Sequence, residues 1–147
     1  MKIRQLSLFL ENRPGQLRVP CKVLGDAGVD ILTMSLADTQ QFGILRLIVK
    51  DWERAKQVLE AAGQVVNVTD LLALDVPDRA GGLADVLEVF EKTNLGVEYM
   101  YPFSMREPGQ SATLLFRLEH PDQAAVALAS AGVKLVSAAE LFKRARV

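Results

Sequence analysis

The stretch "FLENRPGQL", residues 9–17, connects an apolar run to a helical pattern through a Pro-Gly turn. Before it, residues 2–10 carry apolar side chains largely at alternate positions, which predicts a half-buried strand that ends at Glu11. After it, apolar residues fall at helical spacing over residues 16–27, with Pro20 tolerated near the first turn. Such a turn directs backbone N–H groups and the positive end of a helix at one point, which suits a small anion.

The remainder of the first half supplies two more strands and a second helix. Residues 29–38 and 42–50 are typical of strands joined by a polar hairpin loop. Asp51 is suited to cap a helix over residues 52–62, which a glycine ends and a β-branched run follows. The predicted order is β-α-β-β-α-β, the ferredoxin-like arrangement.

The same order recurs in the second half, beginning with residues 71–103 and continuing through a third strand at 111–119 and a helix at 121–131. Residues of the first turn recur 66 positions later: Arg13, Gly15 and Leu17 as Arg79, Gly81 and Leu83. Residues of the second helix recur 69 positions later: Ala55, Leu59 and Gly63 as Ala124, Leu128 and Gly132. We assign the three-residue difference to the second hairpin loop, residues 104–111, because loops absorb insertions at low cost.

The pattern therefore predicts an α+β fold: a duplicated ferredoxin-like βαββαβ unit with antiparallel sheets and helices on one face. Residues 64–76 between the halves are nearly continuous β-type sequence without a linker, so we expect the two units to pack rigidly against each other. We place the first domain at residues 1–68 and the second at 69–147. Ser137 and Glu140 form a capping box that starts a short C-terminal helix.

Composition and charge exclude several classes of protein. Among the 147 residues, 17 basic and 18 acidic side chains give a formal net charge of −1, and no basic face of the kind that binds nucleic acid is evident. The single cysteine, Cys21, allows no internal disulfide and reads as a small buried hydrophobe. Because no stretch is long and apolar enough for a membrane helix or a signal peptide, we expect a cytoplasmic protein.

The residues offer little for catalysis. The one histidine, His120, lies about a hundred positions from Cys21 and is expected to sit at a helix start or on the surface. An acylphosphatase-like site would use an Arg and an Asn, but the adjacent Asn12 and Arg13 point to opposite sides of a strand-like segment. We therefore predict that the protein is not an enzyme and needs no metal or cofactor.

The turn also carries a family resemblance. "ENRPGQL" (11–17), followed after one helix by "GVDI" (28–31), resembles the signature of ACT domains, small ferredoxin-like modules that sense amino acids in metabolic enzymes. The whole chain, including "FGILR", "VNVTD" and "VEYMY", resembles the stand-alone tandem ACT proteins of bacteria. The resemblance implies a ligand between modules, at the first turn of one and against the second strand of its neighbour. Leu10 stands where the serine-sensing pattern has a histidine, which argues against serine.

Carried over by position, the resemblance implies ligand-binding residues in the first half: Asn12, Arg13, Pro14, Gly15, Gln16, Leu17, Asp30 and Ile31. The candidates in the second half are Gly81, Gly82, Leu83, Tyr99 and Tyr101. An amino acid's carboxylate would meet N–H groups around Gly15, and its ammonium would meet Asn12 or Asp30. The second half lacks counterparts of Asn12 and Asp30, so we expect one competent site per chain.

Plainer interpretations stay open for these residues. Gly15 and Gly81 can form tight turns without a ligand, and Asp30 can simply begin a strand. Tyr99 and Tyr101 share one strand face, which is typical of core or interface packing.

The expected function is allosteric regulation through binding of a free amino acid, which would shift the population of one arrangement of modules or subunits. The alternative is a ligand-independent interaction subunit, resembling the small regulatory chain of an acetolactate synthase, that docks on a catalytic partner. The expected partners are thus a free amino acid or related small ligand, with a second copy of the chain or an enzyme.

Overall fold

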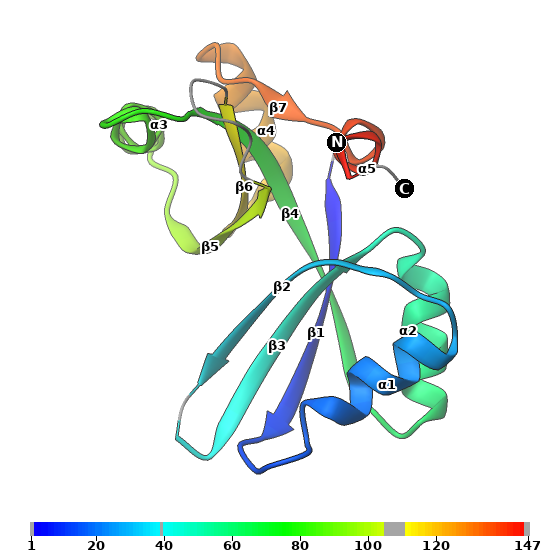
Figure 1. Cartoon of the computed structure of the whole chain (residues 1–147). Coiled ribbons are helices and arrows are strands. Elements are labelled where there is room, and N and C mark those ends of the chain that lie inside the picture. Colours follow the sequence, from blue (N-terminus) through cyan, green and yellow to red (C-terminus); the bar gives the residue numbers. More distant parts are fainter. Residues whose placement is uncertain (1, 39, 105–110, 146–147) are drawn as a thin grey trace. The chain divides into compact units, whose positions relative to one another are not determined.

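The computed structural model describes residues 2–38, 40–104 and 111–145. It forms two compact units, which we call the N-terminal unit (Arg4–Thr69) and the C-terminal unit (Met1–Ile3 with Asp70–Val147) (Figure 1). Each unit has its own helices and its own core.

The N-terminal unit has the predicted βαββαβ order, and its sheet runs β2-β3-β1-β4. The pairs of β1 with β3 and of β2 with β3 are antiparallel. Its elements are β1 (Ile3–Glu11), α1 (Arg18–Asp26), β2 (Ile31–Asp38), β3 (Phe42–Val49), α2 (Trp52–Ala61) and β4 (Val66–Pro77). As predicted, Asp51 caps α2, because its Oδ1 accepts a hydrogen bond of 3.1 Å from the Arg54 N–H.

Alternation along β1 decides which face of this sheet meets the helices. Leu6 and Leu8 lie opposite Leu47 and Leu45 of β3, and all four side chains are fully buried. They pack in one cluster with residues of both helices, among them Leu24 of α1. Figure 1 shows α1 and α2 on the same face of this sheet. Each leucine buried in this way contributes roughly 1.5–3 kcal/mol.

Strand β4 covers most of the stretch between the halves for which the sequence predicted nearly continuous β structure. It is one strand of 12 residues, Val66–Pro77. Residues 66–69 belong to the N-terminal unit and residues 70–77 to the C-terminal unit. The chain thus passes between the units without a loop, as the absence of linker composition predicted, while the rigid packing of the units and a boundary at residue 68 stay predictions.

In the C-terminal unit, β4 lies between β6 and the short β7, and β5 pairs with β6 on the other side. The remaining elements are α3 (Gly82–Lys92), β5 (Val97–Ser104), β6 (Ser111–Leu118), α4 (Pro121–Ser130), β7 (Leu135–Val136) and α5 (Ala138–Arg144). In its core the rings of Phe90 and Phe116 meet edge to face, with centroids 5.2 Å apart. The loop to which we assigned the insertion includes residues 105–110, which lie outside the described residues.

Left-handed backbone recurs at corresponding positions of the two halves. The φ angles are 87° at Gly15 and 82° at Gly81, and 85° at Gly63 and 80° at Gly132. In a further pair, Gly28 (φ 69°) corresponds to Asn94 (φ 54°), a residue type that tolerates this conformation. These pairs are separated by the same 66 and 69 residues that the sequence indicated, so the duplicated ferredoxin-like fold is confirmed.

The second strand-to-helix turn is packed more tightly than the first. Helix α3 begins at Gly82, which corresponds to Gln16, whereas α1 begins two residues later in its own turn, at Arg18 and not at the predicted residue 16. The Arg79 N–H donates to the Pro77 carbonyl (2.9 Å), and a Cβ at Gly82 would lie 2.0 Å from that same oxygen. The turn therefore requires glycine at position 82 for close packing as well as at position 81 for its φ angle.

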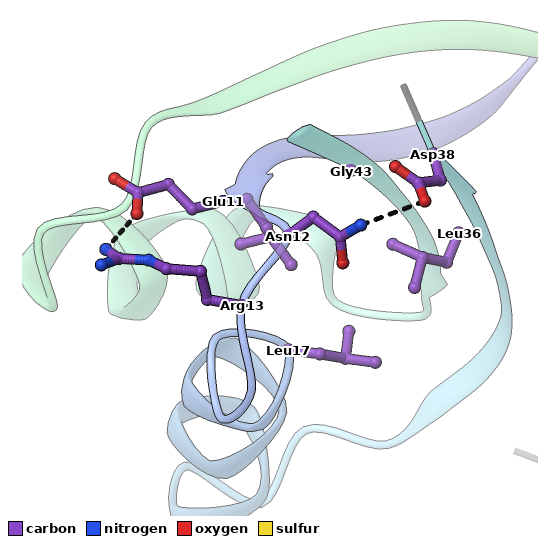
Figure 2. Close-up of a pocket in the computed structure, with 8 residues that line it drawn as sticks. Glu11, Asn12, Arg13, Leu17, Leu36, Asp38 and Gly43 are labelled. Carbon is purple, nitrogen blue, oxygen red and sulfur yellow. Dashed lines mark hydrogen bonds and ion pairs between the residues drawn. The ribbon is translucent and has the colours of Figure 1, made fainter. Parts of the chain in front are cut away.

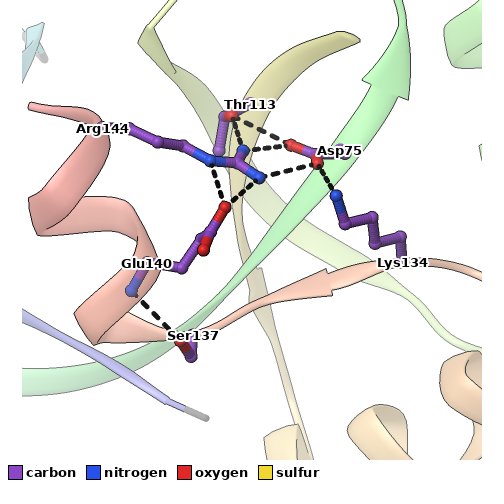
Figure 3. Close-up of polar contacts among 6 residues, drawn as sticks. All are labelled: Asp75, Thr113, Lys134, Ser137, Glu140 and Arg144. Carbon is purple, nitrogen blue, oxygen red and sulfur yellow. Dashed lines mark hydrogen bonds and ion pairs between the residues drawn. The ribbon is translucent and has the colours of Figure 1, made fainter.

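Helix α5 is fastened to the C-terminal unit at both ends. At its start, Ser137 caps the helix as predicted, because its Oγ accepts a hydrogen bond of 3.2 Å from the Glu140 N–H; the Glu140 carboxylate accepts from Arg144 at 3.0 Å. At its end, the Arg144 guanidinium donates to both carboxylate oxygens of Asp75 on β4, at 2.6 and 3.1 Å, and to Thr113 Oγ1 on β6 at 3.0 Å (Figure 3). Only 8% of the Arg144 side chain and 7% of the Asp75 side chain are exposed, so this is a buried ion pair.

Burial and hydrogen bonding act in opposite directions on Asp75. Burial alone would raise the pKa of its carboxyl group, but hydrogen bonds from Arg144, Lys134 and Thr113 outweigh burial and lower the pKa below the ordinary value of 3.8. The pair's contribution to stability is therefore complete above that ordinary value. It is lost as the pH falls through the lowered pKa of the folded chain.

Replacing Arg144 should destabilise the protein strongly. We expect Arg144→Met to lower the free energy of unfolding by about 3 kcal/mol at neutral pH, because it leaves the Asp75 carboxylate buried without its main partner. Urea denaturation would measure the change. The matched control is Lys92→Met, which removes an exposed pair with Glu88 and should cost less than about 0.5 kcal/mol. Equal losses of unfolding free energy in the two variants would show that the ion pair of Asp75 with Arg144 does not stabilise the fold more than an exposed pair does.

Two glycine-to-alanine variants should act in opposite directions. Gly82→Ala should destabilise the chain by about 1–3 kcal/mol, because the Pro77 carbonyl would have to move. Gly25→Ala, in α1 with no atom within 4 Å of the added Cβ, should instead stabilise it by about 0.5–1 kcal/mol. Thermal unfolding of both variants tests this, and a neutral Gly82→Ala would contradict the packing described for the second turn.

Candidate functional site

A small pocket lies beside the first turn of the N-terminal unit (Figure 2). Its volume is about 100 Å³. The end of β1, the turn, the end of β2 and the start of β3 all contribute to its walls: Leu10, Glu11, Asn12, Arg13, Leu17, Leu36, Asp38 and Gly43. Antiparallel pairing brings these segments together, because Leu10 and Asp38 both lie opposite Gly43.

The backbone of the turn is held at several points. The Asn12 N–H donates to the Gln41 carbonyl (2.9 Å), which ties the turn to the β2–β3 hairpin. The Gln16 N–H donates to the Arg13 carbonyl (3.2 Å) across the left-handed Gly15. A preformed turn of this kind lowers the entropy cost of ordering a binding loop.

Helix α1 presents its N-terminal end to this turn. Leu17 is its N-cap residue, and within the described residues no side chain accepts a capping hydrogen bond there. The first N–H groups of an α-helix have no partner inside the helix, and they carry the positive end of its dipole. Pro20 has no N–H, so the donors of this end come from the residues before it. An anion is the natural partner of such an end.

Hydrogen-bond acceptors, in contrast to the N–H donors of the helix end, lie on the β2 side of the pocket. Asn12 Nδ2 donates to Asp38 Oδ2 and to the Gln40 carbonyl, both at 3.1 Å (Figure 2). These bonds orient the Asn12 amide and leave its Oδ1 as an acceptor. The Asp38 carboxylate and the Asn12 oxygen together suit a cation. At the rim, Glu11 and Arg13 form an exposed ion pair with each other.

The remaining wall is apolar and incompletely covered. Leu17 is 39% exposed and Leu36 is 51% exposed, although both line the pocket. An apolar group placed between them would remove this surface from water at roughly 25 cal/mol per Å². The pocket thus combines a polar side suited to a cation and an apolar wall, and the N-terminal end of α1 adjoins it through Leu17.

The predicted site residues of the first half are only partly brought together. Asn12, Arg13 and Leu17 line the pocket, while Pro14, Gly15 and Gln16 form the turn beside it. Asp30 and Ile31 lie at the opposite end of β2 from Asp38 and outside this pocket. If Asp30 contacts a ligand, the turn that completes its site must belong to a different module. Its role in binding therefore stays a prediction.

Sequence reasoning missed Leu36, Asp38 and Gly43, together with Leu10 and Glu11 at the end of β1. The available signal was the predicted hairpin over residues 38–42, whose end must lie beside the end of an adjacent antiparallel strand.

The candidates of the second half have a different setting. Gly81 and Gly82 form the tightly packed turn already described, and Leu83 packs against the core. Tyr101 on β5 is only 7% exposed and Tyr99 is half-buried. These surroundings agree with packing roles, and ligand contacts of these residues stay predictions.

Within the part of the chain that the structure describes, no three His, Cys, Asp or Glu side chains gather as a metal-binding group. Within the same residues, no helix is long and apolar enough to cross a membrane.

Solved structures resemble this chain over nearly its whole length. Protein BT0572 from Bacteroides thetaiotaomicron is 33% identical, covers 97% of this chain and 97% of its own, and superposes with a TM-score of 0.89. The ligand-free regulatory subunit of aspartate kinase from Thermus thermophilus has a TM-score of 0.62 at 13% identity, over 89% of this chain and 93% of its own. The corresponding subunit from Thermus flavus has a TM-score of 0.59 at 14% identity, with the same coverage. At these identities the two Thermus structures show the fold alone.

Sequence comparison gives a consistent result. No curated protein matches the chain. A family model described as an ACT domain pair matches residues 1–145. ACT domains are regulatory modules related to amino-acid-sensing domains. By this match, and by its likeness in sequence and fold to BT0572, the chain belongs to the ACT domain pair family.

Proposed function

We propose that this protein is a cytoplasmic regulator that binds a free amino acid in the pocket at the first turn. The observation that carries the proposal is the placement of three different surfaces around one small space. These are the N-terminal end of α1, the hydrogen-bonded Asn12–Asp38 pair, and the apolar side chains Leu17 and Leu36. A free amino acid is a small molecule that presents a carboxylate, an ammonium and a side chain at once.

Each group of the ligand has a chemically matched partner. The carboxylate accepts hydrogen bonds from N–H groups at the turn and the start of α1, where Gly15 allows a close approach. The ammonium donates to Asn12 Oδ1 and Asp38, a charge-assisted contact. The side chain lies between Leu17 and Leu36. A volume of about 100 Å³ favours a small apolar side chain.

Binding of the amino acid would regulate the partner because the ligand has different affinities for different arrangements of the protein. A ligand that prefers one arrangement of the ACT domains, or one assembly of the chain with its partner, shifts the population toward that arrangement. We place the boundary of the two ACT domains at residue 68 and expect a second copy of the chain or a metabolic enzyme as the partner. The regulatory character of the family supports this scheme.

A ligand-independent docking subunit is the second candidate. It is favoured by two aromatic side chains on the sheet face away from the helices of the N-terminal unit: Phe9 is 60% exposed and Phe42 is 50% exposed. Exposed aromatic pairs of this kind are common in protein interfaces. This candidate predicts binding to a protein partner without any small molecule.

A thermal-shift screen against the twenty amino acids separates the two candidates. We expect one or a few amino acids with small apolar side chains to raise the unfolding temperature. At about a hundred times its dissociation constant, a ligand adds about 2.7 kcal/mol of stability. If none of the twenty changes the transition, sensing of free amino acids is wrong and docking becomes the favoured function.

Two aspartate variants locate the ammonium partner. Asp38→Asn keeps the volume and can still bond Asn12, but it removes the charge, so the dissociation constant of the screened amino acid should rise about ten- to a hundredfold. The matched control, Asp30→Asn, alters the other end of β2 and should leave that constant unchanged. Calorimetric titration measures both. The reverse result would support the position that the family resemblance implied and contradict the pocket.

A further inference from the structure

The end of the N-terminal unit far from the first turn is closed by an arginine. Arg54, in the first turn of α2, donates through its guanidinium to the Ala27 carbonyl at 2.7 Å. Ala27 is the C-cap residue of α1, where unpaired carbonyls carry the negative end of the helix dipole. A guanidinium is well suited to this position because it is always charged and carries several N–H donors.

The corresponding end of the C-terminal unit carries smaller side chains. At the separations fixed by the repeat, Gln123 stands in place of Arg54, Ala127 in place of Val58, and Gly96 in place of Asp30. The left-handed pair Gly28 and Asn94 confirms the alignment beside this site. All three replacements are smaller than the side chains at the matching positions of the N-terminal unit.

A pocket of about 510 Å³ occupies this place. It lies between the end of α3 and the start of α4, and its lining includes Thr93, Asn94, Glu119, His120, Gln123 and Ala127. Thr93 is the C-cap residue of α3, as Ala27 is of α1. The pocket therefore faces the same kind of helix end that Arg54 occupies in the N-terminal unit.

A charged side chain beside this pocket has the opposite sign from its counterpart in the N-terminal unit. Glu119 stands where the N-terminal unit has Lys50. Its side chain is 78% exposed, and its Oε1 lies 3.7 Å from His120 Nε2. A carboxylate beside the negative end of a helix favours a cation. The half-buried Leu95 and the buried Leu118 supply an apolar floor.

We propose that this pocket binds a small molecule with a guanidinium group, which takes the place that Arg54 holds in the N-terminal unit. The guanidinium donates to the Thr93 carbonyl and pairs with Glu119, and its alkyl chain lies on Leu95 and Leu118. The proposal rests on Arg54, Gln123 and the pocket between α3 and α4. It does not depend on amino acid binding at the first turn.

Agmatine is the probe, because it has a guanidinium group but no carboxylate for the first turn. In calorimetric titrations of the full chain, agmatine should bind, and N-carbamoylputrescine, its neutral urea analogue, should bind at least about tenfold more weakly. Absence of agmatine binding at millimolar concentration, or equal affinity for the two compounds, would overturn the proposal.

One variant places the guanidinium on the chain itself. Gln123→Arg should place a guanidinium on the Thr93 carbonyl, as Arg54 places one on the Ala27 carbonyl, so it should lower agmatine affinity at least about tenfold and raise the unfolding temperature. The matched control, Ala129→Arg, adds the same charge to an exposed position of α4 outside the pocket and should leave agmatine affinity unchanged. Equal agmatine affinities of the two variants would show that the compound binds elsewhere and overturn the proposal. Any amino acid bound at the first turn should keep its affinity in both variants, so the two proposals fail independently.

Discussion

The left-handed residue between the first strand and the first helix of each half is the constraint on which the remaining structure depends. Gly15 and Gly81 adopt φ angles of 87° and 82°, where a residue with a Cβ would be strained by about 1–2 kcal/mol. This reversal returns the chain over the face that carries Leu6 and Leu8, and Leu24 of α1 then completes the core. The same reversal places Leu17, at the start of α1, in one pocket with Leu36 and Asp38 at the end of β2, so the fold and the pocket have a common origin.

Most of the fold was predictable because it follows from two periodicities. Alternation in the strands and helical spacing in α2 and α4 are local signals, and the capping residues Asp51 and Ser137 act within a single turn. The start of α1 was placed two residues too early. Helical spacing begins at Leu17, but residues 14–17 form a turn and the helix begins at Arg18. Periodicity reports which face is buried and does not report where helical hydrogen bonding begins.

The pocket was less predictable because it depends on register. Asn12, Arg13 and Leu17 follow from the turn alone, since they are near one another in sequence. Asp38 joins them only because β2 and β3 pair so that it lies opposite Gly43, which in turn lies opposite Leu10. A shift of one residue would move Asp38 to the other face of the sheet. The buried pair of Asp75 with Arg144 has the same character, because it joins residues 69 positions apart.

The two halves of the duplicated fold differ in where a pocket lies: at the first strand-to-helix turn in the N-terminal unit, and at the opposite end in the C-terminal unit. In the N-terminal unit the first turn borders a pocket, and the far end is closed by Arg54 on the Ala27 carbonyl. In the C-terminal unit Gly82 packs closely against the Pro77 carbonyl at the turn, and the far end borders a pocket of about 510 Å³. Each of the two pockets lies beside a helix terminus, whose outermost backbone groups have no partner inside the helix. An arginine side chain and a free guanidinium compound offer the same N–H donors to such a carbonyl, which is why the repeat with Gln123 in place of Arg54 is the one in which we propose a ligand.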